Sequence, residues 1–545
     1  MSKYEADEKH FEQDHVEFAE NGGKQGSQPQ IEGNIQLIGN DGEVRLVPTP
    51  SGSKHDPLSF GKARKVGLLV TVIWFSIIAL SVVGGFGALA PIFFGLYIPQ
   101  GVTADHVVRL LTWPSLFTGL GNFVFLPLAL VVGRRPVFIF ASFMLVGSSV
   151  WAAKSGTSYE SHLGARLLQG FSAGATESLL PLIITDMTFV HQRSKYFGAY
   201  WVAQSLFTAC LNTASSYIAE YLQWAWYYWI FTILAVIGVL LVIFAAPETK
   251  FERPAFAIDG KAAKVDAFGN LVMLTEEEAA HVALDTNADQ TVGPKENMGY
   301  VESLLYRVPA TWSDFKVILN VYKHMVLALL DPAIIWSLGA SSIVLGTTIG
   351  QSLTFGTILQ EKYHWAHQNT GLIYLGTLPI CVLSFLTSGW GGDKINLWFA
   401  KRNGGVHLPE HRLPAIIVPT ILGLSLGVLM YGFCADAAPN VHWIAIVISQ
   451  NMSTYLFICI LITTTTYCVE SMTHHAGAAL VMVVGGKNIL SFGLATAITD
   501  LANTGRNAYA NGILAGCAGG WLLLALPLYF YMPRYRKWKA ERATK

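Results

Sequence analysis

The chain has 545 residues, of which 52% are hydrophobic and 13% are charged, whereas about 25% of the residues of a soluble globular domain are charged. Its 36 basic and 36 acidic residues cancel, so no basic surplus favours a nucleic acid as partner. This composition argues against a soluble enzyme and indicates an integral membrane protein that contacts the lipid bilayer.

Twelve stretches along the chain are apolar, nearly free of charge and long enough to cross a bilayer as helices, which takes about 20 residues each. We therefore predict an all-α integral membrane fold with twelve transmembrane helices. The first six run over 66–90, 107–132, 136–153, 164–187, 196–219 and 222–247. The last six run over 332–360, 368–391, 413–434, 441–468, 475–499 and 508–532.

A long polar segment, 248–331, separates the first six predicted helices from the last six. We therefore expect two pseudo-symmetric six-helix bundles, over 61–247 and 332–532, with a binding cavity between them. The composition of the segment favours disorder or surface helices, including an amphipathic stretch near 309–325, with a regulatory role as the alternative. The bundles are flanked by an acidic tail, 1–60, expected to be disordered, and a basic tail, 533–545.

Lys and Arg residues concentrate before the first predicted helix and after the second, fourth, eighth and twelfth. Cytoplasmic connections carry such an excess, so we expect both termini and the long linker in the cytoplasm. The polar start of the chain has no signal-peptide pattern, so the first helix is expected to direct insertion. The plasma membrane is the expected location.

No pattern of a catalytic or metal centre occurs in the sequence. The six cysteines are spread over the predicted helices without C-x-x-C spacing, and neither a P-loop nor an H-E-x-x-H motif is present. We therefore expect no disulfide framework, no metal, no cofactor and no enzymatic activity.

Charges deep within a membrane helix are costly and are functional candidates by default. Only Glu177 and Lys487 lie deep in predicted helices, and Arg166 lies nearer the extracellular end of the fourth. The 11-residue offset is about three helical turns, which puts Arg166 and Glu177 on one cavity-lining face, roughly 16 Å apart. Because burial favours a protonated carboxyl group, Glu177 could couple transport to protons. It could also bind a cationic substrate or form a static ion pair, with Lys487 as the first partner to test.

A second set of charges lies at the predicted cytoplasmic helix ends. Asp186 follows Glu177 by nine residues, about half a turn out of phase, and so faces elsewhere. It could pair with Arg134 or Arg135 as a gate that locks the outward-facing form, or form a surface salt bridge of little energetic worth. Asp393 and Lys394 could act likewise in the second bundle.

Substrate contacts are expected from helices one, four, seven and ten, where aromatic and amide side chains suit flat or amphipathic organic molecules. Core or lipid-facing packing is the alternative for each of them. These cavity candidates are Trp74, Phe75, Trp336, Gln351, Asn451, Tyr455 and Phe457.

Several motifs resemble those of the major facilitator superfamily, specifically its fungal drug:proton antiporter branch with twelve helices, over about 55–535. The resemblance implies the two-bundle fold and associates Arg166 with coupling. The motifs are H-D-P-L-S-F at 55–60, R-L-L-Q-G at 166–170, D-x-x-F-V-H-Q-R at 186–193, P-E-T at 247–249, and K-R-N-G-G-V with P-E-H-R-L within 401–413.

The chain departs from that family at two places. The segment 127–135 keeps the final G-R-R of the second-to-third connection but lacks its acidic residue, which leaves the usual gate pairing incomplete. The segment 205–214 lacks the glycines and proline of the antiporter signature in the fifth helix.

These features together predict a secondary transporter, acting as a monomer, that exports a small drug-like organic molecule with the proton gradient. Uptake of a polyamine or other organic cation is the alternative, favoured by Glu177 and by the degraded antiporter signature. A second alternative is a transceptor that binds a nutrient and signals without substantial flux.

Overall fold

The computed structural model of the chain describes residues 53–251, 256–258, 261–265, 271–273, 299–306, 315–402, 408–472, 476–502 and 506–543. The first 52 residues, most of the linker and residues 403–407 of the K-R-N-G-G-V motif lie outside them.

The first predicted bundle, called the N half, contains helices α2 to α9, several of them broken into shorter segments. After the short turn η1 (Pro57–Ser59), they are α2 (Lys62–Gly84), α3 (Phe86–Tyr97), η2 (Ile98–Gln100), α4 (Ala104–Val132), α5 (Arg134–Ala153), α6 (Tyr159–Ala173), η3 (Gly174–Thr176), α7 (Leu179–Asp186), α8 (Val190–Leu222) and α9 (Trp224–Ala245).

The second bundle, called the C half, contains helices α13 to α21, with π-helical turns at η6 and η8. They are α13 (Pro332–Tyr363), η5 (His367–Gly376), α14 (Thr377–Ser384), η6 (Phe385–Trp390), α15 (Gly391–Arg402), η7 (Pro409–Ile416), α16 (Ile417–Leu422), η8 (Gly423–Leu429), α17 (Met430–Ala437), α18 (Ile444–Ser471), α19 (Ala476–Ala502), α20 (Asn507–Leu523) and α21 (Ala525–Ala543).

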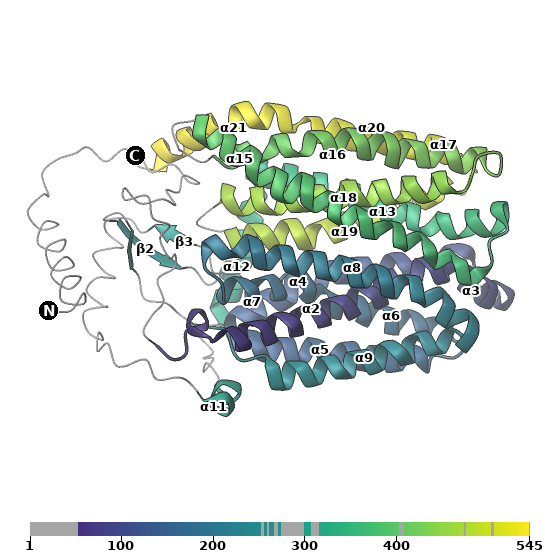
Figure 1. Ribbon diagram of the computed structural model, residues 1–545, viewed down its shortest axis with the longest axis horizontal. Coiled ribbons are helices and arrows are strands. Elements are labelled where there is room, and N and C mark those ends of the chain that lie inside the picture. The colour runs from purple at the N-terminus through teal and green to yellow at the C-terminus, as the bar shows by residue number, and fades with distance from the viewer. Residues whose placement is uncertain are drawn as a thin grey trace, which may run out of the picture.

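Eleven segments of the described chain are long and apolar enough to cross a membrane. The predicted fifth helix lies within α8, which is not among the eleven because polar residues such as Gln204, Asn212 and Ser216 dilute its apolar content. Those three side chains are buried, so these polar groups of α8 lie inside the protein rather than against lipid. The helices run side by side in two groups (Figure 1). The predicted all-α membrane fold with two bundles is confirmed.

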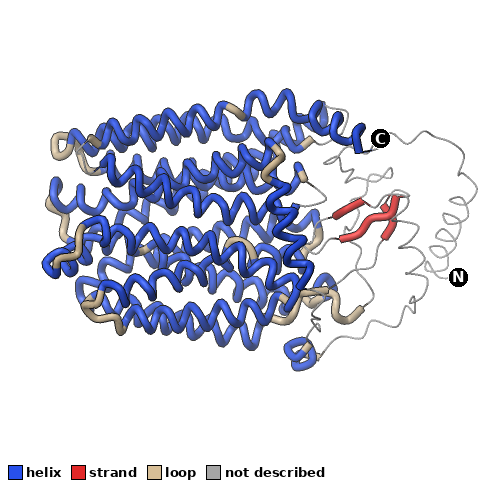
Figure 2. The backbone as a smooth tube through the Cα atoms, turned by 180° about the vertical axis from the view of Figure 1, so that it is seen from behind, coloured by secondary structure: helices blue, strands red, loops and turns tan. Residues whose placement is uncertain are grey.

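The bundle has two ends, which are named here by the chain segments they hold. The proximal end holds the first turn of α2 and the last turn of α21, and the distal end holds the last turn of α3 (Figure 1). The described strands of the linker lie beyond the proximal end, as the view from behind also shows (Figure 2).

The linker contains a small sheet that the sequence interpretation did not include. Strands β1 (Phe256–Ile258), β2 (Lys261–Val265) and β3 (Leu271–Met273) pair antiparallel in the order β1-β2-β3. The pair Asp259-Gly260 separates the first two strands in sequence and is a typical hairpin signal. Two helices follow, α11 (Tyr300–Leu305) and α12 (Phe315–Ala328).

The segment before the first helix is fixed to the linker. Asp56 caps η1 by accepting a hydrogen bond from the Leu58 backbone N–H at 3.0 Å. The Lys54 ammonium donates to the carboxylate of Glu302 on α11 at 2.7 Å, and this hydrogen bond lowers the pKa of Glu302. Lys54, which directly precedes the motif at 55–60, therefore connects the start of the N half to α11.

The two halves meet along α4 and α19 in the middle and along α8 and η5 at the distal end. At the distal contact, Ser216 Oγ donates to the Gln368 carbonyl at 2.8 Å and Tyr217 donates to Asn369 Oδ1 at 3.0 Å. These hydrogen bonds join the halves at their distal end.

Candidate functional site

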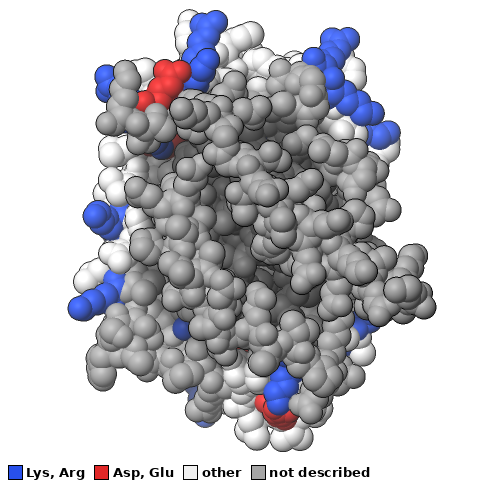
Figure 3. All heavy atoms as spheres, turned by 90° about the vertical axis from the view of Figure 1, so that its left-hand side faces the viewer, with Lys and Arg blue, Asp and Glu red and all other residues white. Residues whose placement is uncertain are grey.

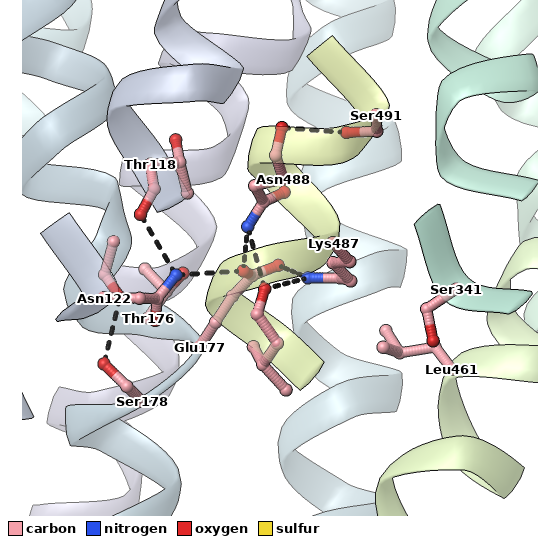
Figure 4. Close-up of polar contacts among 12 residues, drawn as sticks. Thr118, Asn122, Thr176, Glu177, Ser178, Ser341, Leu461, Lys487, Asn488 and Ser491 are labelled. Carbon is pink, nitrogen blue, oxygen red and sulfur yellow. Dashed lines mark hydrogen bonds and ion pairs between the residues drawn. The ribbon is translucent and has the colours of Figure 1, made fainter. Parts of the chain in front are cut away.

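The two charges predicted to lie deep in the membrane form an ion pair between the halves. Lys487 Nζ of α19 lies 2.7 Å from Glu177 Oε1, at the break in the fourth transmembrane helix (Figure 4). The Lys487 side chain is fully buried and that of Glu177 is 12% exposed. The pair therefore holds opposite charges together where each alone would be costly to bury.

Two amides complete the environment of the carboxylate. Glu177 Oε2 accepts hydrogen bonds from Asn488 Nδ2 at 2.6 Å and from Asn122 Nδ2 at 3.3 Å (Figure 4). Lys487 Nζ also donates to the Val484 carbonyl at 3.3 Å. Both carboxylate oxygens of Glu177 thus accept hydrogen bonds from side chains of α4 or α19. The site is thus a satisfied ion pair in this conformation.

Glycines bring the helices of this site close together. A Cβ atom on Gly119 would lie 2.8 Å from the Gly485 carbonyl oxygen, and one on Gly485 would lie 3.2 Å from Asn122 Cβ. Both helices carry the spacing G-x-x-N, with Gly119 and Asn122 on α4 and Gly485 and Asn488 on α19. Each asparagine therefore follows a glycine of the contact by about one turn and reaches the same carboxylate.

The expectation that Arg166 and Glu177 share one face assumed a continuous fourth helix, and the structure breaks that helix between the two residues. The 3-10 turn η3 separates α6 from α7, and Ser178 has φ −121° and ψ −60°. The offset of 11 residues therefore does not place the two side chains as in one α-helix. The same break removes the basis for the expected phase between Glu177 and Asp186.

Arg166 instead lies within the N half and binds backbone carbonyls where the first helix breaks. Its guanidinium donates to Val82, Val83 and Leu110 carbonyls at 2.7, 3.1 and 3.1 Å, and to Gln169 Oε1 at 3.1 Å. It also stacks over the Phe86 ring, 4.4 Å from its centroid. Arg166 therefore supplies donors to two carbonyls at the α2–α3 junction, where helical partners are lost, and to one carbonyl of α4.

The predicted gate residue Asp186 pairs with Arg134, one of the two proposed partners. Asp186 Oδ2 accepts from Arg134 Nε at 3.0 Å and from Thr249 Oγ1 at 3.1 Å. Both charged side chains are nearly buried, at 5% and 6% exposure. Arg134 and Asp186 both belong to the N half, and Thr249 lies at the start of the linker, so the pair connects the start of α5 to the end of α7 rather than joining the halves. Its gate role stays a prediction.

Glu248 supplies an acidic partner that the sequence interpretation did not identify. Its carboxylate accepts from the backbone N–H of Arg134 at 3.0 Å and of Arg135 at 3.2 Å, at the start of α5, where the helix dipole favours an anion. The Arg135 guanidinium donates to the Ile243 carbonyl at 2.8 Å. Glu248 therefore supplies a carboxylate beside Arg134 and Arg135, in a segment (127–135) that has no acidic residue of its own.

The C half has a corresponding cluster at its proximal end. Arg412 bridges Asp393, at 3.1 Å, and Glu470 of α18, at 2.6 Å. Buried Glu410 and Arg536 form a second ion pair beside it. Lys394 instead lies over the Trp390 ring, 3.6 Å from its centroid. The gate roles assigned to Asp393 and Lys394 stay predictions.

The cavity candidates on the first helix pack inside the N half. Trp74 Nε1 donates to the Leu234 carbonyl of α9 at 2.9 Å. Phe75 is 2% exposed and meets Phe138 edge to face, with ring centroids 5.3 Å apart.

The other five candidates pack inside the C half. Trp336 Nε1 donates to the Trp521 carbonyl at 3.1 Å, and Gln351 Nε2 donates to Asn511 Oδ1 at 3.1 Å. Asn451 Nδ2 donates to the Ile373 carbonyl at 3.0 Å, and the Tyr455 hydroxyl donates to Thr387 Oγ1 at 3.0 Å. Phe457 packs against the core around Trp336. The structure does not gather the seven candidates around one site, and their substrate roles stay predictions.

The site residues that sequence reasoning missed are of two kinds. Asn122 and Asn488 are uncharged, so a search for charges within the membrane passes over them, although their shared G-x-x-N spacing was readable. Glu248 and Glu470 lie near the ends of helices, where an acidic residue is common and its partner comes from a distant segment.

Comparisons with known proteins agree with this architecture. The family model of the Major Facilitator Superfamily matches residues 71–496. An uncharacterized MFS-type transporter of Schizosaccharomyces pombe is 24% identical over 440 residues, covering 75% of this chain and 73% of the relative. Protein HOL1 of Saccharomyces cerevisiae is 23% identical over 548 residues, covering 91% and 90%.

A solved structure shows the same fold. The E. coli xylose transporter XylE, in a partially occluded inward-open conformation, superposes with a TM-score of 0.55 at 13% identity, covering 87% of this chain and 98% of XylE. The family match, the two bundles and the transmembrane helices together show that the chain belongs to the major facilitator superfamily of transporters rather than to an enzyme family.

Proposed function

We propose that this chain is a proton-coupled secondary transporter that exports a small drug-like organic molecule, with the Glu177–Lys487 pair as its coupling site. The observation that carries the proposal is the position of the pair, because its two charges belong to different halves. Alternating access moves one half against the other around a central site. A movement that separates α19 from the fourth transmembrane helix pulls these two charges apart.

Breaking the pair would give Glu177 a reason to take up a proton. A carboxylate that loses its ammonium and amide partners while out of water favours the neutral form. The buried Oδ1 of Asn122 accepts no hydrogen bond among the described residues, so it can accept one from a protonated Glu177. Proton uptake then accompanies separation of the halves, and proton release accompanies re-formation of the pair.

A second candidate function is uptake of a polyamine or other organic cation. The ammonium of Lys487, 2.7 Å from Glu177, is chemically like the group that such a substrate carries. A substrate amine could replace Lys487 against the carboxylate, and the partly exposed face of Glu177 would be its approach. This candidate places the substrate, rather than a proton, on Glu177.

The proposed location is the plasma membrane. The proposed orientation places the proximal end on the cytoplasmic side. Lys and Arg side chains surround the rim of the proximal face (Figure 3). Such an excess is typical of the cytoplasmic side of multi-helix membrane proteins. We propose the monomer as the transporting unit, since both partners of the pair come from one chain.

The test uses purified protein in liposomes that carry a pH gradient, with the uncharged compound cycloheximide as the drug-like probe and spermidine as the cationic one. For each probe, binding, exchange without a gradient, and gradient-driven flux are measured for the wild type and Glu177→Gln. If Glu177 carries the proton, the variant keeps binding and exchange but loses gradient-driven flux, because an amide does not titrate.

If Glu177 binds a cationic substrate, the same variant instead weakens spermidine binding by about 1–3 kcal/mol, the cost of an unpaired charged contact. Wild-type values for all three measurements would overturn both roles. Absence of flux for both probes in the wild type, with binding retained, would favour the transceptor alternative. Glu361→Gln, an exposed carboxyl change at the distal end of α13, is the matched control.

A further inference from the structure

The linker helix α12 lies across both halves of the transporter. Its buried residues Val321 and Met325 pack against Leu126 and Leu130 of α4 and against Val481 of α19, among others. The Tyr322 hydroxyl donates to the Phe123 carbonyl of α4 at 2.8 Å. One face of α12 is therefore fixed on the outer side of the α4–α19 contact.

The opposite face of α12 presents a stripe of exposed side chains. Lys316, Leu319, Lys323 and Val326 are all exposed and follow one another at intervals of three, four and three residues, which places them on one face of a helix. Leu319 and Val326 are 71% and 65% exposed. Large apolar side chains thus alternate with lysines along the outer face.

Further exposed apolar side chains follow the stripe along the chain. Leu330, 72% exposed, lies in the turn between α12 and α13, and Ile335 in the first turns of α13 is 44% exposed. Exposed apolar side chains at the start of a transmembrane helix are suited to contact with acyl chains. A helix with such a face and with lysines beside it is typical of the membrane interface.

We propose that the outer stripe of α12 is a binding site for anionic phospholipid of the leaflet at the proximal end. Neither Lys316 nor Lys323 has an ion-pair partner among the described residues, and they are two turns, about 10 Å, apart. A phospholipid satisfies both parts of the stripe, since its phosphate pairs with lysine while its acyl chains cover Leu319 and Val326. A soluble anion would satisfy the lysines alone.

The test is native mass spectrometry of the full chain in detergent with added phosphatidylserine or phosphatidylcholine. We expect the wild type to bind phosphatidylserine more tightly than phosphatidylcholine. Lys316→Gln combined with Lys323→Gln is expected to weaken phosphatidylserine binding about 30-fold, which corresponds to ~1 kcal/mol per lysine. Lys362→Gln, an exposed lysine at the distal end of α13, is the matched control and is expected to leave binding unchanged.

Two further arms decide between lipid and other ligands. Leu319→Asn is expected to weaken the binding of both lipids, because it removes apolar contact rather than charge. Displacement of phosphatidylserine by the soluble headgroup glycerophosphoserine would show a site for soluble anions and overturn the proposal. Equal binding by the wild type and the double lysine variant would also overturn it. Unchanged thermal unfolding in detergent confirms that each variant is folded.

Discussion

Glu177 Oε2 accepts hydrogen bonds from Asn122 of the N half and Asn488 of the C half, at 3.3 and 2.6 Å. Its other oxygen binds Lys487 at 2.7 Å. One carboxylate thereby links α4, the fourth transmembrane helix and α19. The three donors cannot all remain in place if α4 and α19 separate, so this group reports directly on the relative position of the halves.

Lys487→Met is expected to destabilise the protein by about 3–5 kcal/mol, because it leaves Glu177 as an uncompensated buried charge. Lys487→Met combined with Glu177→Gln is expected to recover most of that loss, since no charge is then left without a partner. Thermal unfolding of the purified variants in one detergent measures both effects. A double variant no more stable than the single one would show that the pair is not the source of the loss.

Gly119→Ala is expected to push α4 and α19 apart, because the new Cβ would lie 2.8 Å from the Gly485 carbonyl oxygen and from Ile489 Cγ1. Overpacking of this kind costs about 1–3 kcal/mol. Gly493→Ala on α19 is the control, because a Cβ there meets nothing within 4 Å. We expect thermal unfolding to fall for the first variant and to stay equal or rise for the second; similar values would contradict a tight contact at Gly119.

Much of the fold was predictable because long apolar segments and a polar linker have few other solutions in a membrane. The charges Glu177 and Lys487 were likewise identifiable, since their burial in lipid is costly enough to mark them. Their pairing was foreseen as a possibility only, because the contact depends on how α19 packs beside the fourth helix. Asp186 and Arg134 were matched in the same way.

What the sequence did not indicate depends on breaks and on long-range packing. The 3-10 turn after Ala173 changes the direction of side chains beyond it, and helical periodicity counted through residue 177 cannot include that change. The main hydrogen-bond partners of Arg166 are backbone carbonyls, and no pattern of side chains in the sequence reveals such partners. The aromatic candidates Trp74 and Trp336 have the composition of a cavity wall but pack within single halves.

Asp186→Asn is expected to change the balance between conformations more than substrate affinity, because Asp186 forms a buried pair with Arg134, whereas Glu177 binds Lys487, Asn488 and Asn122. A differential interaction of about 1 kcal/mol changes the balance about fivefold. The labelling rate of a single cysteine placed at Gln368, in the distal contact, measures the balance. Asp393→Asn, whose side chain is 55% exposed, is expected to change it little. Unaltered labelling and transport in Asp186→Asn would exclude the gate role.

The proposed orientation predicts which single cysteines react with a reagent that does not cross membranes. In intact cells, cysteines at positions 157 and 436 are expected to be labelled, and those at 20, 280 and 540 only after permeabilisation. The charge distribution around the proximal end is the reason. Labelling of position 280 in intact cells would contradict both the orientation and a linker on the cytoplasmic side.

Arg166→Lys is expected to destabilise the N half although it keeps the positive charge. A lysine has one compact ammonium group, whereas the guanidinium donates to three carbonyls and an amide oxygen and stacks on Phe86. Each buried acceptor left without a donor costs about 1–3 kcal/mol. The Val82 carbonyl keeps the Tyr227 hydroxyl at 3.1 Å, so the loss falls on Val83, at the junction between α2 and α3, and on Leu110 of α4.

The matched control is Arg506→Lys, because Arg506 is exposed at the start of α20. We expect a clear fall in the thermal unfolding temperature for Arg166→Lys and none for the control. Hydrogen exchange should rise in the last turn of α2, where Val82 and Val83 lie, before it rises elsewhere in the N half. If exchange there stays at the wild-type level while gradient-driven flux is lost, Arg166 acts in coupling rather than in stabilising the α2–α3 junction. Such a result would mean that the guanidinium is needed for transport but not for the local structure, because lysine keeps the positive charge.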